Sequence, residues 1–205
     1  TGYGFALLPQ KHYTRAGGQL ERLIGSGEEV REIEKIFREG AETGITRLRI
    51  ESQEEYARTE DMGKYGYIHF STHGILDARF QAIALSQIPG AREDGFLTLG
   101  EIMNSRYNAQ LVVLSACETG LGRMDRGEGV TGLTRAVMYA GTPAAVVSLW
   151  SVSDEGTKEL MVRFYKNLII RKMRKDDALR LAKLELLGLH QSGRGQFLRS
   201  VKIVD

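Results

Sequence analysis

The chain has 205 residues, of which 42% are hydrophobic and 26% charged, enough for one apolar core and too few for two comfortable domains. Twenty-eight basic and 26 acidic residues leave a formal net charge of +2, so the whole chain lacks the field of a nucleic-acid or membrane-surface binder. A single cysteine excludes an internal disulfide, and no apolar run approaches the roughly 20 residues of a membrane span. We therefore expect one domain, residues 1–205, in a reducing, cytoplasmic setting, as part of a larger protein or complex.

The first predicted elements lie between residues 28 and 70. In residues 28–38 the apolar side chains of Ile33, Ile36 and Phe37 share one face, which predicts an amphipathic helix. Residues 45–50 alternate, which is typical of a strand near a sheet edge. A run at residues 67–70, like later runs at 111–116 and 144–150, is nearly continuous in apolar residues. Such runs indicate strands that are buried on both faces.

The middle and last parts of the chain alternate in the same way. Residues 77–105 have weak periodicity and many turn residues, which predicts a loop-rich excursion with a hairpin or short helix at 98–103. A helix that ends at Gly141 is indicated by apolar positions Leu133, Ala136, Val137 and Ala140. Two more helices are predicted, one capped by Ser153 or Asp154 with Leu160, Phe164 and Leu168, the other with Ala178, Leu181 and Ala182. The alternation favours an α/β domain with a mainly parallel sheet.

Two reactive side chains follow two of the predicted strands. Cys117 stands where the run LVVLSA gives way to a glycine-bearing loop, and His73 stands just beyond the strand at 67–70. Functional groups of open α/β sheets gather beyond the carboxyl ends of the strands. If these strands are neighbours, an imidazole can take the proton of a thiol whose unperturbed pKa of about 8.5 keeps it mostly protonated. Gly74 adds a position whose backbone N–H could face an oxyanion.

Simpler interpretations exist for these and other residues. A lone cysteine after an apolar strand is usually a packing residue. His69 lies four residues before His73, a spacing that would suggest a pair of metal ligands on a helix. On a strand the two side chains do not converge on one metal ion, so His69 is expected to be a core or supporting residue. In the loop at 120–129, Gly122 and Gly127 have the spacing of a nucleotide-binding P-loop, but Glu128 stands where the phosphate-binding lysine should be. We therefore expect a flexible loop beside a protease cleft rather than a nucleotide-binding loop. Residues 163–175 hold six basic side chains and no acid, for which a solvated helix face is the default over a docking patch.

Several motifs in order resemble one known family. They are STHGILD, LVVLSACETGLG, GEGVTGLTRAVMYAGTPAAVVSLWSVSDEGT and LMVRFYKNL, and the resemblance is clearest over residues 28–186. The chain resembles the CHAT family of caspase-like cysteine proteases, whose members are often joined to tetratricopeptide or other sensor modules. The resemblance implies an α/β, caspase-like mixed sheet, mainly parallel, with helices on both faces.

The same resemblance assigns roles to particular residues. It implies a catalytic dyad of His73 and Cys117, with the backbone N–H groups of Gly74 and Cys117 forming the oxyanion hole. It places Ser115, two residues before the cysteine, at the border of the substrate pocket. Glu118 is a further candidate there, because an acid beside the cysteine could orient the dyad or contact a basic substrate side chain.

The sequence therefore predicts a cysteine endopeptidase that cleaves a protein substrate and is activated by a sensor module or partner protein. The alternative is a catalytically silent CHAT-like scaffold that binds partner proteins. A flavodoxin-like or receiver-like ligand-binding domain would fit the strand and helix alternation alone, but leaves the cysteine and histidine unexplained. No cofactor, metal or membrane is expected to take part, and any RNA contact would be indirect, through a partner.

Overall fold

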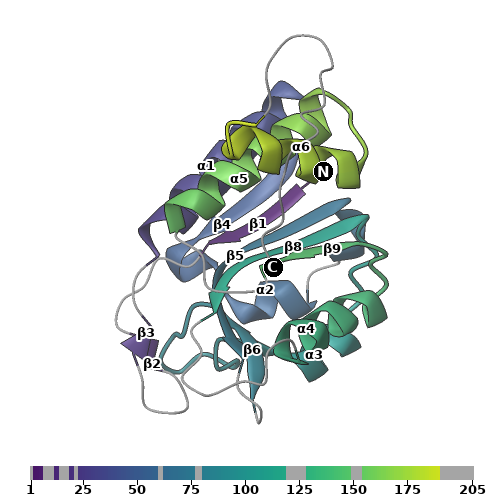
Figure 1. Cartoon of the computed structure of the whole chain (residues 1–205). Coiled ribbons are helices and arrows are strands. Elements are labelled where there is room, and N and C mark those ends of the chain that lie inside the picture. Colours follow the sequence, from purple (N-terminus) through teal and green to yellow (C-terminus); the bar gives the residue numbers. More distant parts are fainter. Residues whose placement is uncertain are drawn as a thin grey trace, which may run out of the picture.

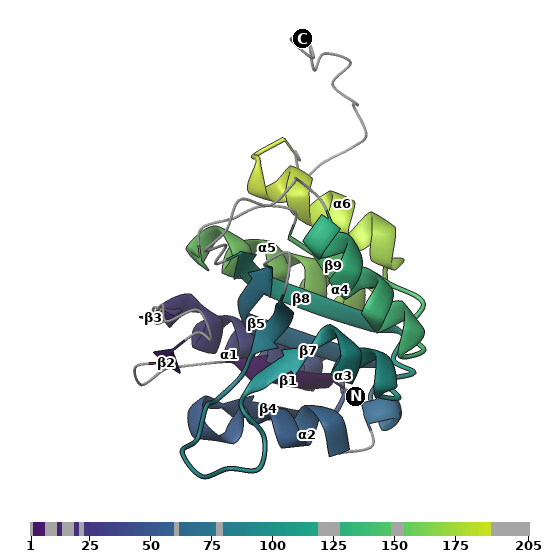
Figure 2. The same ribbon diagram turned by 90° about the horizontal axis from the view of Figure 1, so that it is seen from below.

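The computed structural model describes residues 2–6, 12–13, 19–20, 23–59, 62–76, 80–118, 128–148 and 154–189. At its centre lies a row of parallel strands, each hydrogen-bonded to the next. In spatial order these are β4 (Gly44–Leu48), β1 (Gly2–Ala6), β5 (Tyr67–Leu76), β8 (Leu111–Glu118) and β9 (Ala145–Val147). The row can be followed from bottom to top in Figure 2. It places β5 and β8 in the middle, where both faces of a strand are covered.

An antiparallel hairpin extends this row and makes the sheet mixed. Strand β6 (Gln81–Ala84) pairs with the last three residues of β5, and β7 (Phe96–Thr98) pairs with β6. Gly74 is the register partner of Glu118 on one side and of Ile83 on the other. The hairpin therefore lies on the side of β5 where β1 has already ended. Among the described residues this sheet has seven strands, and a separate small sheet pairs β2 (His12–Tyr13) with β3 (Gln19–Leu20).

Helices cover both faces of the sheet (Figure 1). One layer contains α1 (Ile24–Glu39), α5 (Asp154–Tyr165) and α6 (Lys175–Leu186), and α5 continues through a π-helical turn, Lys166–Ile170. The opposite layer contains α2 (Glu54–Thr59), α3 (Leu99–Asn104) and α4 (Glu128–Tyr139). Short 3₁₀ turns at Arg49–Glu51 and Met62–Lys64 connect elements on that side. This three-layer arrangement is the fold class that the alternation predicted.

Strand alternation divides the apolar side chains between two main cores. Ile68 and Phe70 of β5 and Val112 of β8 face the layer of α3 and α4, where they pack with Leu133 and Val137. Leu111 and Val113 face the other way and pack against α1 and α5. Because successive side chains of a strand point to opposite faces, a nearly continuous apolar run is what a doubly covered strand requires.

Most predicted elements are present, but some begin or end at other residues than the sequence predicted. The predicted helix at 28–38 is α1, which begins four residues earlier, at Ile24. The predicted edge strand at 45–50 is β4, which does lie at one edge, but Arg49 has φ 54° and turns the chain into a 3₁₀ segment. Gly141 ends the helical region with φ 92°, as expected for a C-terminal glycine.

The loop-rich excursion also follows the prediction. It contains the β6–β7 hairpin and the short helix α3, whose N-terminus forms a capping box in which Thr98 and Glu101 each accept from the other's backbone N–H. Three of the six basic side chains in segment 163–175 form ion pairs. Arg163, Arg171 and Arg174 contact the carboxylates of Glu159, Glu185 and Asp176. Lys175 donates to the backbone carbonyl of Gln110, so the solvated-face interpretation fits this segment best.

Several features named in the sequence lie outside the described residues. They are residues 119–127 of the predicted glycine-rich loop, Trp150, Ser153, Asp77 and the segment 190–205. Within the ranges that are described, no helix combines the length and the apolar character needed to cross a bilayer.

Candidate active site

The two candidate catalytic residues occupy matching positions on neighbouring strands. β5 and β8 pair in parallel over eight residue pairs, from Tyr67 with Leu111 to Gly74 with Glu118, and His73 is the register partner of Cys117. Neighbouring strands lie about 4.8 Å apart, and register partners occupy the same face of a sheet. The sequence motifs at 73 and 117, which are 44 positions apart in the chain, thus meet at one point of the sheet.

The strands continue further than the sequence analysis predicted. His73 and Gly74 do not lie just beyond the end of a strand: they are within β5, which continues to Leu76. Cys117 is likewise within β8, which ends at Glu118. The reason is the hairpin: β6 pairs with residues 74–76 and holds the chain extended past the polar residues that resemble a loop in the sequence. The dyad positions still lie at the carboxyl-terminal ends of both strands.

The His73 side chain lies within the protein interior. Its residue exposure is 2%, and alternation along β5 places it on the same face as Tyr67 and His69, toward α1 and α5. Gly74 is buried, and it is the register partner of Ile83 in β6 and of Glu118 in β8. Both residues are therefore fixed by the sheet itself.

The residues expected beside the cysteine are Ser115 and Glu118. Ser115 is the register partner of Ser71 and is buried at 7% exposure. Its hydroxyl has no hydrogen-bond partner among the described residues, which is uncommon for a buried oxygen. Glu118 is the last residue of β8 and pairs with Gly74, and the structure describes its backbone position only. Ser115 thus lies two register pairs before His73 and Cys117.

His69 is a buried supporting residue, as expected from its sequence context. Its Nε2 lies 2.8 Å from Glu29 Oε1, and the two side chains are 3% and 1% exposed. Its Nδ1 lies 3.3 Å from the Tyr165 hydroxyl. The three residues connect β5 to α1 and α5. Sequence reasoning missed Glu29, because a glutamate in the first turns of a helix is ordinarily a solvated residue.

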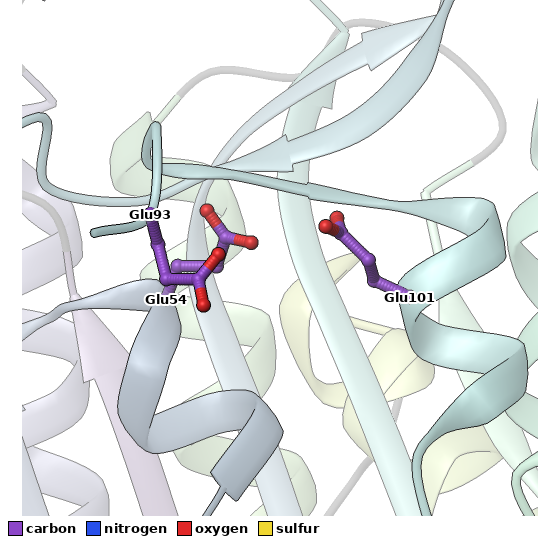
Figure 3. Close-up of side chains that lie close together, drawn as sticks. All are labelled: Glu54, Glu93 and Glu101. Atoms are coloured by element: carbon purple, nitrogen blue, oxygen red, sulfur yellow. The ribbon is translucent and has the colours of Figure 1, made fainter.

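One cluster of carboxylates could suggest a metal site. Oxygens of Glu54, Glu93 and Glu101 lie within 4.8 Å of one another, and the three side chains converge from α2, the loop before β7, and α3 (Figure 3). The Arg58 guanidinium contacts all three, at 3.2, 2.5 and 3.1 Å. A fixed cation therefore already balances part of this charge, so the cluster is an ion-pair network. Nothing in the sequence indicated it, since the glutamates are widely separated.

Glu54, the buried member of this network, has a raised pKa. Burial, followed by repulsion from Glu101, raises the pKa of Glu54 to about 6, although the Gly95 N–H and Arg58 both donate to its carboxylate. A folded pKa above the unfolded value of 4.5 means that the folded state binds this proton more tightly. The associated stability is present below pH 4.5 and is lost as the pH rises through 6.

The comparisons with known proteins identify the family of the chain. The mixed sheet, parallel at its centre and covered by helices on both faces, is the fold class expected of a caspase-like protein. A family model described as the CHAT domain matches residues 9–194. The chain belongs to the CHAT domain family. This result removes the flavodoxin-like and receiver-like interpretations, which rested on the strand and helix alternation alone.

Two curated relatives share part of the chain. Tetratricopeptide repeat protein 28 of Mus musculus is 34% identical over 95 residues, which is 46% of this chain and 4% of that protein. Tetratricopeptide repeat protein 28 of Homo sapiens is 28% identical over 95 residues, with the same coverage. The chain thus matches only a small part of each of these long relatives.

We expect Glu54→Gln to change the pH dependence of stability, because the neutral amide removes the buried carboxylate. The stability of the wild type relative to the variant should fall by about 1–2 kcal/mol between pH 4 and pH 7.5. Urea unfolding at a series of pH values measures this difference. Glu55→Gln, at an exposed position of the same helix, is the control and should change it little. A difference for Glu54→Gln that does not vary with pH would show that burial does not perturb this carboxyl.

Proposed function

We propose that this domain is a cysteine endopeptidase that cleaves a protein substrate, with Cys117 as nucleophile and His73 as general base. The observation that carries the proposal is the register of β5 with β8, which makes His73 the partner of Cys117. Membership of the caspase-like CHAT family supports it. The 28 basic and 26 acidic residues and the single cysteine are compatible with a cytoplasmic enzyme.

The proposed reaction has two stages. His73 accepts the thiol proton, and the Cys117 sulfur attacks the peptide carbonyl carbon to form a tetrahedral oxyanion. Collapse of this intermediate breaks the C–N bond, His73 protonates the departing amine, and a thioester remains on Cys117. A water molecule that gives a proton to His73 then attacks the thioester. Its breakdown releases the carboxylic acid product and restores the thiol.

The neighbouring residues have supporting roles in this proposal. Backbone N–H groups of Gly74 and Cys117 would stabilise the oxyanion, for which one donor contributes roughly 2.7–4 kcal/mol in a studied protease. Ser115 and Glu118 would border the substrate pocket. The buried Ser115 hydroxyl, which has no partner among the described residues, supports this placement because a substrate group could supply one.

We also propose that a sensor module or partner protein activates the domain. Two observations support regulation. His73 is 2% exposed, so the resting conformation gives a substrate little access to the base. The relatives that match this chain are named as tetratricopeptide repeat proteins, and the match covers 4% of each, which leaves room for such modules in those proteins. Opening of the site on activation would be a population shift.

The burial of His73 is also the observation that favours the alternative, a silent scaffold that only binds partner proteins. The two functions differ in one property. A scaffold has no need for the thiol to be ionised or to react, whereas a protease requires both.

Cys117→Ala and His73→Ala should each reduce peptide-bond cleavage by about 10³-fold or more, because the two side chains act as one unit. The double variant should be no more than a few-fold slower than either single variant. Cleavage of the protein substrate by the activated full-length protein is the measurement, with circular dichroism to check folding. His12→Ala is the matched histidine control and should retain activity. Near wild-type cleavage by either dyad variant would contradict the assignment.

We expect the isolated domain to cleave slowly and the full-length protein with its activating partner to cleave fast. The reason is that catalytic groups must be held to within about 0.5 Å of their productive geometry, which a closed resting site does not provide. Single-turnover cleavage, compared between the two preparations, measures the difference without interference from product release. Equal rates would show that the dyad of the isolated domain is already aligned and accessible, and that activation by a module plays no part.

A further inference from the structure

Helices α3 and α4 lie side by side on the face of the sheet opposite to α1 and α5 (Figure 1). Two contacts show that they run in the same direction. A Cβ atom at Gly132, near the start of α4, would lie 3.2 Å from Leu99 Cδ1 at the start of α3. At the other end, the Tyr107 N–H donates to the Ala140 carbonyl oxygen at 2.8 Å. The junction between the two helices therefore extends from Leu99 to Tyr107.

Large apolar side chains are exposed along this junction. Met103 follows Leu99 by one turn of α3, and Tyr139 lies two turns of α4 beyond Gly132. Each therefore lies on the side of its helix that meets the other helix. Met103 is 45% exposed, Met138 54% and Tyr139 74%, the highest value for a large apolar side chain among the described residues. Single exposed apolar side chains are common on protein surfaces, but a group of them at one junction is typical of an interaction site.

The segments that form this junction carry two cations and no acid. Arg135 lies in α4 one turn before the exposed tyrosine, and Arg106 directly precedes Tyr107, which is bonded to the end of α4. Both arginines are exposed, and neither pairs with a carboxylate of another described residue. Residues 103–110 and 131–141 contain no aspartate or glutamate. The local charge at the junction is therefore positive.

We define the α3–α4 patch as Met103, Arg106, Arg135, Met138 and Tyr139. Its composition is that of a protein interface, because methionine, tyrosine and arginine are enriched at such surfaces. Unbranched methionine side chains adapt to the shape of a partner, and tyrosine and arginine are common hot-spot residues. A second copy placed symmetrically against the same patch would bring like charges together, which disfavours self-association. A partner of the opposite charge is favoured.

We propose that the α3–α4 patch binds an acidic segment of a partner protein that also carries large apolar side chains. The apolar side chains of the segment pack on Tyr139 and the two methionines. Its carboxylates pair with the two guanidiniums, whose planar fork binds a carboxylate through two parallel hydrogen bonds. Two arginines are few for a nucleic-acid backbone, and a formal net charge of +2 gives the chain little long-range attraction to one.

The patch is separate from the proposed catalytic chemistry. The His73 side chain faces the layer of α1 and α5, whereas α3 and α4 cover the other face of the sheet. Binding at the patch therefore does not require a reactive dyad, and the proposal holds for a protease and for a scaffold alike. The two proposals can fail separately.

The test begins with a selection on the full chain from a random displayed library of peptides of about 15 residues, long enough for a helix of four turns. Selected peptides should have a net negative charge and several large apolar side chains. Their dissociation constants, measured by fluorescence anisotropy, should lie at about 1–100 µM, as expected for a small interface. Added salt should weaken binding, because exposed charge pairs are screened.

Variants of the chain locate the binding. Tyr139→Ala should weaken the selected peptides at least about tenfold. Arg106→Gln and Arg135→Gln should each weaken them about threefold and reduce the effect of salt. Leu187→Ala, at 68% exposure beyond α6, and Arg31→Gln, at an exposed position of α1, are matched controls in the opposite layer and should have no effect. Circular dichroism should show unchanged folding, because all of these side chains are exposed.

Three results would overturn the proposal: a selection that enriches no peptide, enrichment of peptides without acidic side chains, or peptide binding that neither Tyr139→Ala nor the arginine variants change. A concentration-dependent dimer in analytical ultracentrifugation that Tyr139→Ala disrupts would overturn it in favour of self-association. Binding of poly(U) RNA or of phosphatidylserine vesicles that the arginine variants abolish, in the absence of peptide binding, would assign the patch to a nucleic acid or a lipid surface instead.

Discussion

The parallel pairing of β5 with β8 is the constraint on which the rest of the structure depends. Eight residue pairs fix the two strands against each other in the middle of the sheet, with Ile68, Phe70, Val112 and Val113 fully buried. A slip of one residue would exchange the faces of every side chain and would remove His69 from its contacts with Glu29 and Tyr165, so these contacts help to specify the register. The same register makes His73 the partner of Cys117. The register that packs the core side chains of β5 and β8 is therefore the same register that sets the geometry of the proposed dyad.

The two helical layers pack against these paired strands through different kinds of contact. The layer of α3 and α4 packs on it through apolar side chains, including Leu133 and Val137. The layer of α1 and α5 adds a buried polar connection, in which Glu29 and Tyr165 contact His69. Removing one partner of such a contact leaves a buried polar group without its hydrogen bond, which typically costs about 1–3 kcal/mol. The β5 strand thus combines a fixed polar contact at its start with the proposed catalytic histidine near its end.

Local sequence patterns predicted those elements whose formation depends on the hydrophobic pattern and turn residues of their own segment. Continuous apolar runs marked β5 and β8, the spacing of Ile33, Ile36 and Phe37 marked α1, and Gly141 marked the end of the α4 region. Strand β1 was not recognisable, because GYGFA holds two glycines and no apolar run, and it is extended only through its pairing with β4 and β5. The full lengths of β5 and β8 were missed for the same reason.

The candidate site was likewise predictable only where its residues belong to local sequence patterns. The positions of His73, Gly74 and Cys117 were predictable because each follows an apolar run or belongs to a family motif, and strand pairing brings them together. The contact of Glu29 with His69 and the network of Arg58 with three glutamates were not predictable. Their members are 40 residues apart in the first case and come from α2, α3 and a loop in the second, so only tertiary packing reveals them.

The central claim is that His73 ionises Cys117, and the most direct measurement is the pH dependence of Cys117 alkylation. Because the chain has one cysteine, the mass increase on reaction with iodoacetamide reports this thiol alone, without a substrate. In the wild-type chain with its activating partner bound, the rate should titrate with an apparent pKa at least one unit below the unperturbed value of about 8.5, and in His73→Gln with the same partner the titration should return to about 8.5. Identical titrations in the two proteins would contradict the account.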